Sequence, residues 1–283
     1  VTKTFRTYLS SGNGNGDALK VDKIWYEFPV GDNNTIWVGP KIENYYMHGT
    51  TPSIYKPVTK QFTLGGNGEA YGASTDSGAG WAYKADNGFA LSSNVVSKQN
   101  GTAKGLFTNQ SDISWATQAG YTTDQWSVSA LINQKYNGWS DTYYHSLGHS
   151  PSPACTTCNF SSVGLRSWWR PLETGTATPS VSLGYDITNY DQATAASDSS
   201  TAWFAGLTWQ DIFQADDRIG LAFGQPTTNE DETTVDPFAY ELYYSFKAND
   251  SVTITPAVFG GSDRNGTAGD DVFGAVLEST FKF

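Results

Sequence analysis

The chain of 283 residues contains few charged residues, only two cysteines and one methionine, and no long apolar run. Charged residues make up 16% and apolar residues 38%, whereas soluble domains average about 25% and about 45–50%. No stretch approaches the ~18 apolar residues of a membrane helix, which excludes a helical membrane protein but not a β-barrel. Two cysteines do not make a disulfide scaffold.

The charge of the chain is one-sided. There are 17 Lys and Arg against 28 Asp and Glu, which gives a formal net charge of −11. An acidic chain without a basic cluster argues against a nucleic-acid-binding protein. Aromatic residues make up 14% of the chain, and this argues against a disordered acidic chain, since disordered chains are poor in aromatics.

Alternation with period 2, which is typical of a two-faced β-strand, recurs throughout the sequence. In 236–248, for example, Phe238, Tyr240 and Leu242 lie on one face and Glu241 on the other. The pattern predicts about fourteen strands, at 1–10, 20–30, 34–44, 78–85, 88–97, 111–121, 124–137, 160–171, 178–189, 200–213, 217–225, 236–248, 251–261 and 271–283.

The connections between these strands alternate in length. The short ones are 31–33, 86–87, 122–123, 172–177, 214–216 and 249–250, and the long ones are 11–19, 45–77, 98–110, 138–159, 190–199, 226–235 and 262–270. Outer-membrane barrels have short periplasmic turns, long external loops and aromatic girdles at both interfaces. We therefore expect an all-β, transmembrane, antiparallel up-and-down barrel. The alternative is a secreted β-sandwich that binds glycans through exposed Trp.

Three segments resemble a known family. Residues 21–40, VDKIWYEFPVGDNNTIWVGP, resemble a hairpin of the cyanobacterial porins in the OprB-type, carbohydrate-selective or iron-uptake family. Residues 5–13, FRTYLSSGN, resemble the strand before that hairpin. The closing VLESTFKF resembles the C-terminal strand of outer-membrane barrels in general.

The resemblance implies that residues 1–283 are the pore domain of a porin that is incomplete at its N-terminus. Family members carry an S-layer-homology domain that grips peptidoglycan, and this sequence has none. Two further strands upstream would bring the fourteen to sixteen in the intact barrel. Residues 45–77 then become the third external loop, which folds into the lumen of trimeric porins and narrows it. The resemblance thus implies a homotrimer in the outer membrane. It also implies that the loop 45–77 forms the narrowest section of the pore, with Lys56 and Lys60 as its candidate charges.

The alternation also sorts charged side chains by face, because a charge on the lipid face costs about 2–4 kcal/mol at the midplane. The residues expected to line the pore are Arg6, Lys23, Glu27, Lys41, Glu43, Lys84, Lys135, Arg166, Trp168, Arg170, Asp186, Arg218, Glu241, Lys247, Glu278 and Lys282. Bases exceed acids in this set, which predicts a basic-lined channel whose wall favours anions, whereas acidic external loops such as 229–232 favour cations, so the ion selectivity stays open. In one interpretation Arg166 and Arg170, with Trp168 between them, form a basic ladder. In the other, lumen charges pair across the wall, as Lys23 with Glu43 or Glu241 with Lys282.

One cluster has the residue types of a metal site. His145, His149, Cys155 and Cys158 lie close together in one predicted external loop. Two Cys and two His are a zinc ligand set, although the usual order and spacing differ. A disulfide between the two Cys is the alternative, because the compartment outside the cell is oxidising.

Catalysis has little support, since no G-x-S-x-G or H-E-x-x-H motif occurs and the three His all lie in predicted loops. We expect a non-enzymatic outer-membrane porin without a resident cofactor, in contact with lipid. It would pass small hydrophilic solutes and inorganic ions by passive diffusion. An outer-membrane receptor or enzyme stays open as a second alternative.

Overall fold

The computed structural model describes residues 21–66, 69–71, 75–99, 108, 111–137, 159–191, 199–228 and 235–282. Thirteen strands make up most of these residues. They are β1 (Ile24–Val30), β2 (Asn34–Glu43), β3 (Thr75–Lys84), β4 (Phe89–Gln99), β5 (Ser111–Thr122), β6 (Trp126–Tyr136), β7 (Phe160–Trp169), β8 (Ser180–Tyr190), β9 (Ser199–Gln210), β10 (Arg218–Thr228), β11 (Phe238–Asn249), β12 (Val252–Ser262) and β13 (Val272–Phe281). Four short 3₁₀ helices, η1 (Asn44–Met47), η2 (Lys60–Gly65), η3 (Glu69–Tyr71) and η4 (Arg264–Gly266), lie between strands.

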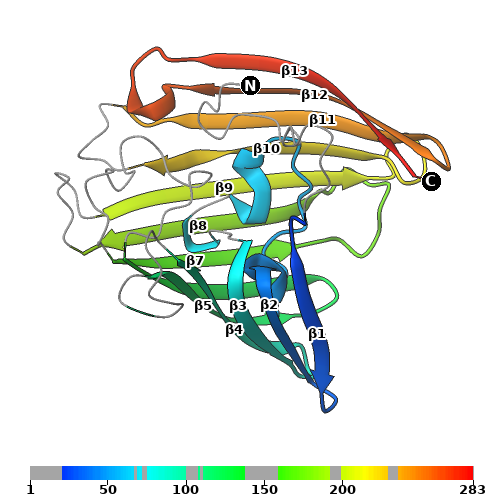
Figure 1. Ribbon diagram of the computed structural model, residues 1–283. Coiled ribbons are helices and arrows are strands. Elements are labelled where there is room, and N and C mark those ends of the chain that lie inside the picture. The colour runs from blue at the N-terminus through cyan, green and yellow to red at the C-terminus, as the bar shows by residue number, and fades with distance from the viewer. Residues whose placement is uncertain are drawn as a thin grey trace.

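The strands form one antiparallel sheet in which each strand pairs with its neighbours in sequence, from β1 to β13 (Figure 1). This confirms the all-β up-and-down topology and thirteen of the fourteen predicted strands. The fourteenth, at 1–10, lies outside the described residues. Within the described residues β1 and β13 are the two edges of the curled sheet and do not pair with each other, so the barrel is not closed.

The two faces of the sheet differ in chemistry, and the difference is the reverse of that in a soluble protein. One face, called here the outer face, exposes large apolar side chains such as Ile132 (50%), Leu165 (49%) and Leu242 (46%). The other, the inner face, buries polar ones such as Ser92, Asn133 and Ser162, each at 0% exposure. Since side chains alternate along a strand, each strand presents both chemistries at once.

The charged residues of strands β3 to β11 follow the same rule. All of them share the alternation phase of the buried positions and so belong to the inner face: Asp76, Lys84, Lys98, Asp112, Lys135, Arg166, Asp186, Arg218, Glu241 and Lys247. An outer face without charge is what a lipid contact requires.

The connections alternate in length along most of the chain but not throughout, since 170–179 is longer than 191–198, 229–237 and 263–271. At one end of the sheet they span 31–33, 85–88, 123–125, 170–179, 211–217 and 250–251, and at the other 44–74, 100–110, 137–159, 191–198, 229–237 and 263–271. The connections 170–179 and 211–217 are longer than predicted, because the strands beside them stop earlier than the apolar pattern does. None of the described residues forms a helix long and apolar enough to span a membrane.

The core of the molecule lies between the inner face and the connection that follows β2. We call residues 44–66 and 69–71 the inner segment. Tyr55 and Phe62 of this segment pack with Phe204 and Tyr243 of the wall, and Tyr71 packs with Leu131. The described strands thus form one sheet covered by a segment of chain rather than two sheets packed on each other, which contradicts the β-sandwich alternative.

The exposed outer face gives a first prediction. Leu165 lies at the middle of β7 and is 49% exposed, and Leu172 lies in the 170–179 turn and is 83% exposed. If the outer face contacts lipid, Leu165→Arg should lower the unfolding free energy in phospholipid vesicles by about 2–4 kcal/mol. Leu172→Arg is the matched control and should change it by less than about 0.5 kcal/mol. Urea titration followed by Trp fluorescence measures both, and equal small effects would contradict a lipid-facing β7.

Candidate functional site

The inner segment crosses the inner face and returns. Going along the chain, the carbonyl of Asn44 accepts a hydrogen bond from Asn94 on β4, the amide of Thr50 donates to Gln118 on β5, and the amide of Ile54 donates to Ser182 on β8. Residues 55–59 then reach Glu241 on β11. After this tip, the segment comes back to contact β7 and β6.

At the tip, the carboxylate of Glu241 accepts four hydrogen bonds and is fully buried. Its Oε1 accepts from the hydroxyl of Tyr55 at 2.9 Å and from the amide of Val58 at 3.0 Å. Its Oε2 accepts from the amide of Thr59 at 2.7 Å and from the hydroxyl of the same residue at 2.6 Å. Burial, and then the charge of Glu241, raise the pKa of the Tyr55 hydroxyl, which therefore stays protonated as the donor.

On the return path, Arg166 on β7 forms the most buried ion pair described. Its Nη2 lies 2.7 Å from Oδ2 of Asp186 on β8, and the two side chains are 1% and 4% exposed. The guanidinium also donates from Nε to the carbonyl of Leu64 at 2.8 Å and lies 4.6 Å from the ring centre of Tyr71. Such a neutralised and covered guanidinium holds the inner segment rather than attracting a solute.

The segment touches the wall backbone to backbone at one point. A Cβ atom built on Gly184 of β8 would collide with the carbonyl oxygen of Gly65. Gly65 itself has φ +74, in the left-handed region that favours glycine. Nearby, the indole of Trp168 donates to the carbonyl of Thr51 at 3.1 Å. Glycine at positions 65 and 184 therefore lets the segment lie flat on the sheet.

A polar network fixes the rest of the return path. The amide nitrogen of Gln118 donates to the carbonyl of Thr50 at 3.1 Å and to the hydroxyl of Tyr71 at 3.0 Å, and Asn133 donates to the carbonyl of Ala70 at 3.0 Å. His48 lies edge-on to Tyr71, with ring centres 5.4 Å apart. Burial lowers the pKa of His48 to about 4, so this side chain carries no charge at neutral pH.

The placement of Arg166 corrects the basic ladder suggested by the sequence. Arg166 and Trp168 point inward but are covered by the inner segment, with exposures of 3% and 7%. Arg170 lies just beyond the end of β7, is exposed, and donates to the carbonyl of Asp124. The sequence pattern put both arginines on one strand face, but Arg170 lies outside β7, and the pattern contains no information about a distant segment that covers Arg166.

The other candidate residues divide between the two ends of the strands. Lys23 forms an ion pair with Glu43, as one interpretation proposed; Glu27 accepts from the Trp37 indole at 2.7 Å, and Lys41 donates to the carbonyl of Val21. At the short-turn end, Lys84 and Lys282 are exposed, Arg218 is half-buried, and Lys247 pairs with Asp216 at 2.6 Å.

Three further candidates belong to β6, β11 and β13. Lys135 is buried and Glu278 is exposed. Glu241 binds the inner segment rather than Lys282. Arg6 lies outside the described residues.

The sequence patterns missed three inner-face charges. Asp76 and Lys98 belong to β3 and β4, although both were expected in loops, and Asp112 on β5 lies directly opposite Lys98. Lys98 shares its alternation phase with Val96, so extending the strand by one pleat would have found it. These charges lie at the long-loop end of the wall and mix both signs there.

Two lysines of the inner segment were expected to be constriction charges. Lys56, at the tip, is exposed, and Lys60 is half-buried. The four residues of the suggested metal site, His145, His149, Cys155 and Cys158, lie outside the described residues. Within the ranges that the structure describes, no group of three or more His, Cys, Asp or Glu is placed to hold a metal ion.

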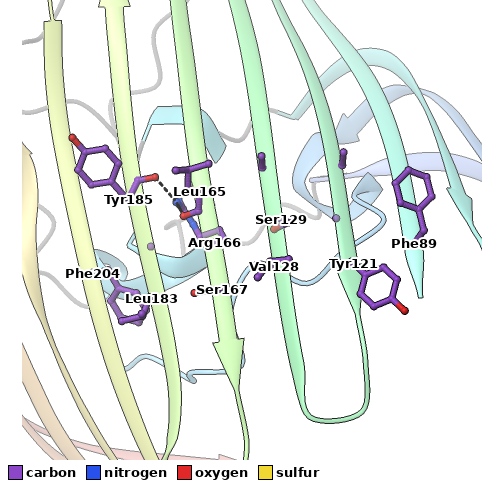
Figure 2. A pocket seen from close by; sticks show the side chains of 14 residues that line it. Phe89, Tyr121, Val128, Ser129, Leu165, Arg166, Ser167, Leu183, Tyr185 and Phe204 are labelled. Atoms are coloured by element: carbon purple, nitrogen blue, oxygen red, sulfur yellow. Dashed lines mark hydrogen bonds between the residues drawn. The ribbon is translucent and has the colours of Figure 1, made fainter. Parts of the chain in front are cut away.

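A hollow of about 770 Å³ is lined by residues of β4 to β9, among them Arg166. Figure 2 shows Phe89 and Tyr121 on one side of it and Tyr185 on the other. The outer face is hollowed here because two small side chains, Ala119 of β5 and Ala130 of β6, lie opposite each other. Apolar outer-face residues such as Val128 and Leu183 provide most of its lining, so it is a depression in the outer face rather than a solute site.

Comparisons with known proteins agree with this architecture. No family model matches the chain, and no curated protein matches it in sequence. Among solved structures, it is similar to OprB of Pseudomonas putida at high pH, with a TM-score of 0.57 and 13% identity over 89% of this chain and 70% of that one. It is also similar to the trimer form of in-vitro folded OmpT, an outer membrane protein of Vibrio cholerae, with a TM-score of 0.55 and 12% identity over 94% and 80%.

At these identities the likeness establishes the fold. The chain therefore has the antiparallel up-and-down β-barrel fold of these solved structures, which confirms the predicted fold class.

The buried ion pair gives a second prediction. Arg166→Ala leaves the carboxylate of Asp186 buried without its guanidinium, which costs about 3–5 kcal/mol. We expect the unfolding free energy, measured by urea titration, to fall by that amount. Replacing both residues, as Arg166→Met with Asp186→Leu, should recover most of the loss, because no charge is then left buried. A single variant as stable as the wild type would show that the pair is solvated.

Proposed function

We propose that this chain is the pore-forming barrel of a porin in a bacterial outer membrane. It passes small hydrophilic solutes and inorganic ions by passive diffusion, without an energy source and without covalent chemistry. The proposal rests mainly on one observation. The outer face is apolar and exposed, while the inner face is polar and carries a segment of chain anchored from β4 to β11.

The inner segment is the constriction in this proposal. It covers part of the inner face, which leaves the solute path on its other side. Lys56 is exposed at its tip and Lys60 is half-buried, so they are the segment charges best placed to meet a solute. The neutralised Arg166 and the paired Lys23 then contribute little to ion selectivity, and the basic lining is reduced to the bases that stay accessible to water.

Several finer points belong to the same proposal. A homotrimer is supported by the likeness to OmpT of Vibrio cholerae, whose structure is a trimer form. Cyanobacterial origin and a separate peptidoglycan-binding domain are predictions from the resemblance of residues 5–40. A receptor or an outer-membrane enzyme is the alternative for a barrel of this fold, and it requires saturable ligand binding or turnover that passive diffusion does not show.

Conductance tests the proposal directly. Purified protein, refolded in detergent, should insert into planar lipid bilayers and produce stepwise increases in current. Liposomes that contain it should swell in small sugars, because a water-filled channel admits them without binding. Heat-denatured protein at the same concentration is the control. A folded protein that inserts into liposomes but neither conducts nor admits sugars would refute the porin function.

The charge at the tip of the segment gives a further prediction. Lys56→Glu reverses an exposed charge in the proposed constriction, and charged rings in a low-dielectric channel select ions of opposite sign. In a salt gradient the reversal potential should shift toward cation selectivity, and Lys56→Gln should give a smaller shift in the same direction. Identical reversal potentials in all three proteins would remove Lys56 from the ion path.

A further inference from the structure

The tip of the inner segment is held by a carboxylate of the wall, whereas near Leu64 the charged wall group that holds the segment is the guanidinium of Arg166. The contacts to β4, β5, β6 and β8 are hydrogen bonds between neutral groups, such as Thr50 with Gln118 and Ile54 with Ser182. The tip is held by the ionisable Glu241, which accepts four hydrogen bonds within residues 55–59. Hydrogen bonds to a charged acceptor are roughly twice as strong as neutral ones.

The tip is also the part of the segment that reaches farthest across the wall. The segment leaves β2, contacts β4 and β5 first, reaches β11 at residues 55–59, and then returns to Arg166 on β7 and Asn133 on β6. Tyr55 and Phe62 also pack with Phe204 and Tyr243 of the wall. Among the described wall residues, Glu241 is the one that hydrogen-bonds the tip.

We propose that Glu241 is a positioning residue that sets the width of the channel by holding the tip of the inner segment against β11. This inference rests on the proposed porin function. With the carboxylate in place, the tip lies flat on the wall and Lys56 is presented at a fixed position. Without it, the tip leaves the wall and changes both the cross-section of the solute path and the position of that charge.

The chemistry predicts a specific effect of Glu241→Gln. The amide group that replaces one carboxylate oxygen is a donor, and each oxygen of Glu241 now faces two donors. Whichever way the Gln amide turns, its NH2 group meets one backbone N–H that it cannot accept from, and one hydroxyl that has to rotate and accept instead of donating. The volume of the side chain is nearly unchanged, so the packing of Tyr55 with Phe204 needs no rearrangement around a cavity.

Two measurements test the assignment in the full chain. Amide hydrogen exchange at Val58 and Thr59, followed by mass spectrometry, should speed up about tenfold in Glu241→Gln, because the lost bonds are charge-assisted. Single-channel conductance and the exclusion limit for polyethylene glycols of graded size should change together with that exchange. Glu173→Gln, the same substitution at an exposed residue of the 170–179 turn, should leave exchange, conductance and exclusion limit at wild-type values.

A second variant covers the case in which Glu241→Gln fails to fold. Tyr55→Phe with Thr59→Val removes the two hydroxyl donors, keeps the carboxylate, and should give smaller changes in the same direction.

The outcomes separate the two proposals. A wild-type protein that never conducts overturns the porin function itself. A conducting wild type whose exchange, conductance and exclusion limit are all unchanged in both tip variants overturns only the role of Glu241. Faster exchange with unchanged conductance and exclusion limit also overturns it, because Glu241 would then stabilise the tip without setting the channel width.

Discussion

Side chains on a β-strand alternate between two faces, and every strand of this sheet must therefore present one chemistry outward and another inward. The outer face exposes residues such as Leu165 and Leu242, and the inner face covers Asn133 and Glu241. A shift of one residue in register would turn each charge outward, so the register is strongly fixed. The surface on which the inner segment packs and the position of every strand charge depend on this constraint.

Charges on the inner face have two different roles. One group is buried and holds the chain together. Arg166 and Asp186 pair with each other, Arg166 also donates to the inner segment, and Glu241 accepts hydrogen bonds from it. Lys56 at the tip of the segment is exposed and remains available to a solute. Counting inward charges therefore overestimates the field in a channel, because a paired and covered charge contributes little to it.

The inner segment is attached along its whole path, but its attachments differ in kind. Neutral amides and hydroxyls fix the outgoing and returning parts, an ion pair fixes the turn near Leu64, and a single carboxylate fixes the tip. Between these attachments, Tyr55 and Phe62 pack with Phe204 and Tyr243 of the wall, and Tyr71 packs with Leu131. This combination gives a segment that is both well packed and dependent on a few polar groups.

The sequence by itself determined the strands, their order and their two faces, because alternation and connection length are local patterns that a chain displays directly. It also placed Arg166 and Glu241 on the inner face and indicated that the connection after β2 is exceptional. What each of these residues contacts was decided by the tertiary structure alone. The partners of Arg166 at Leu64 and of Glu241 at Thr59 lie more than a hundred positions away, and no periodicity within a strand encodes which side chains a distant segment will cover.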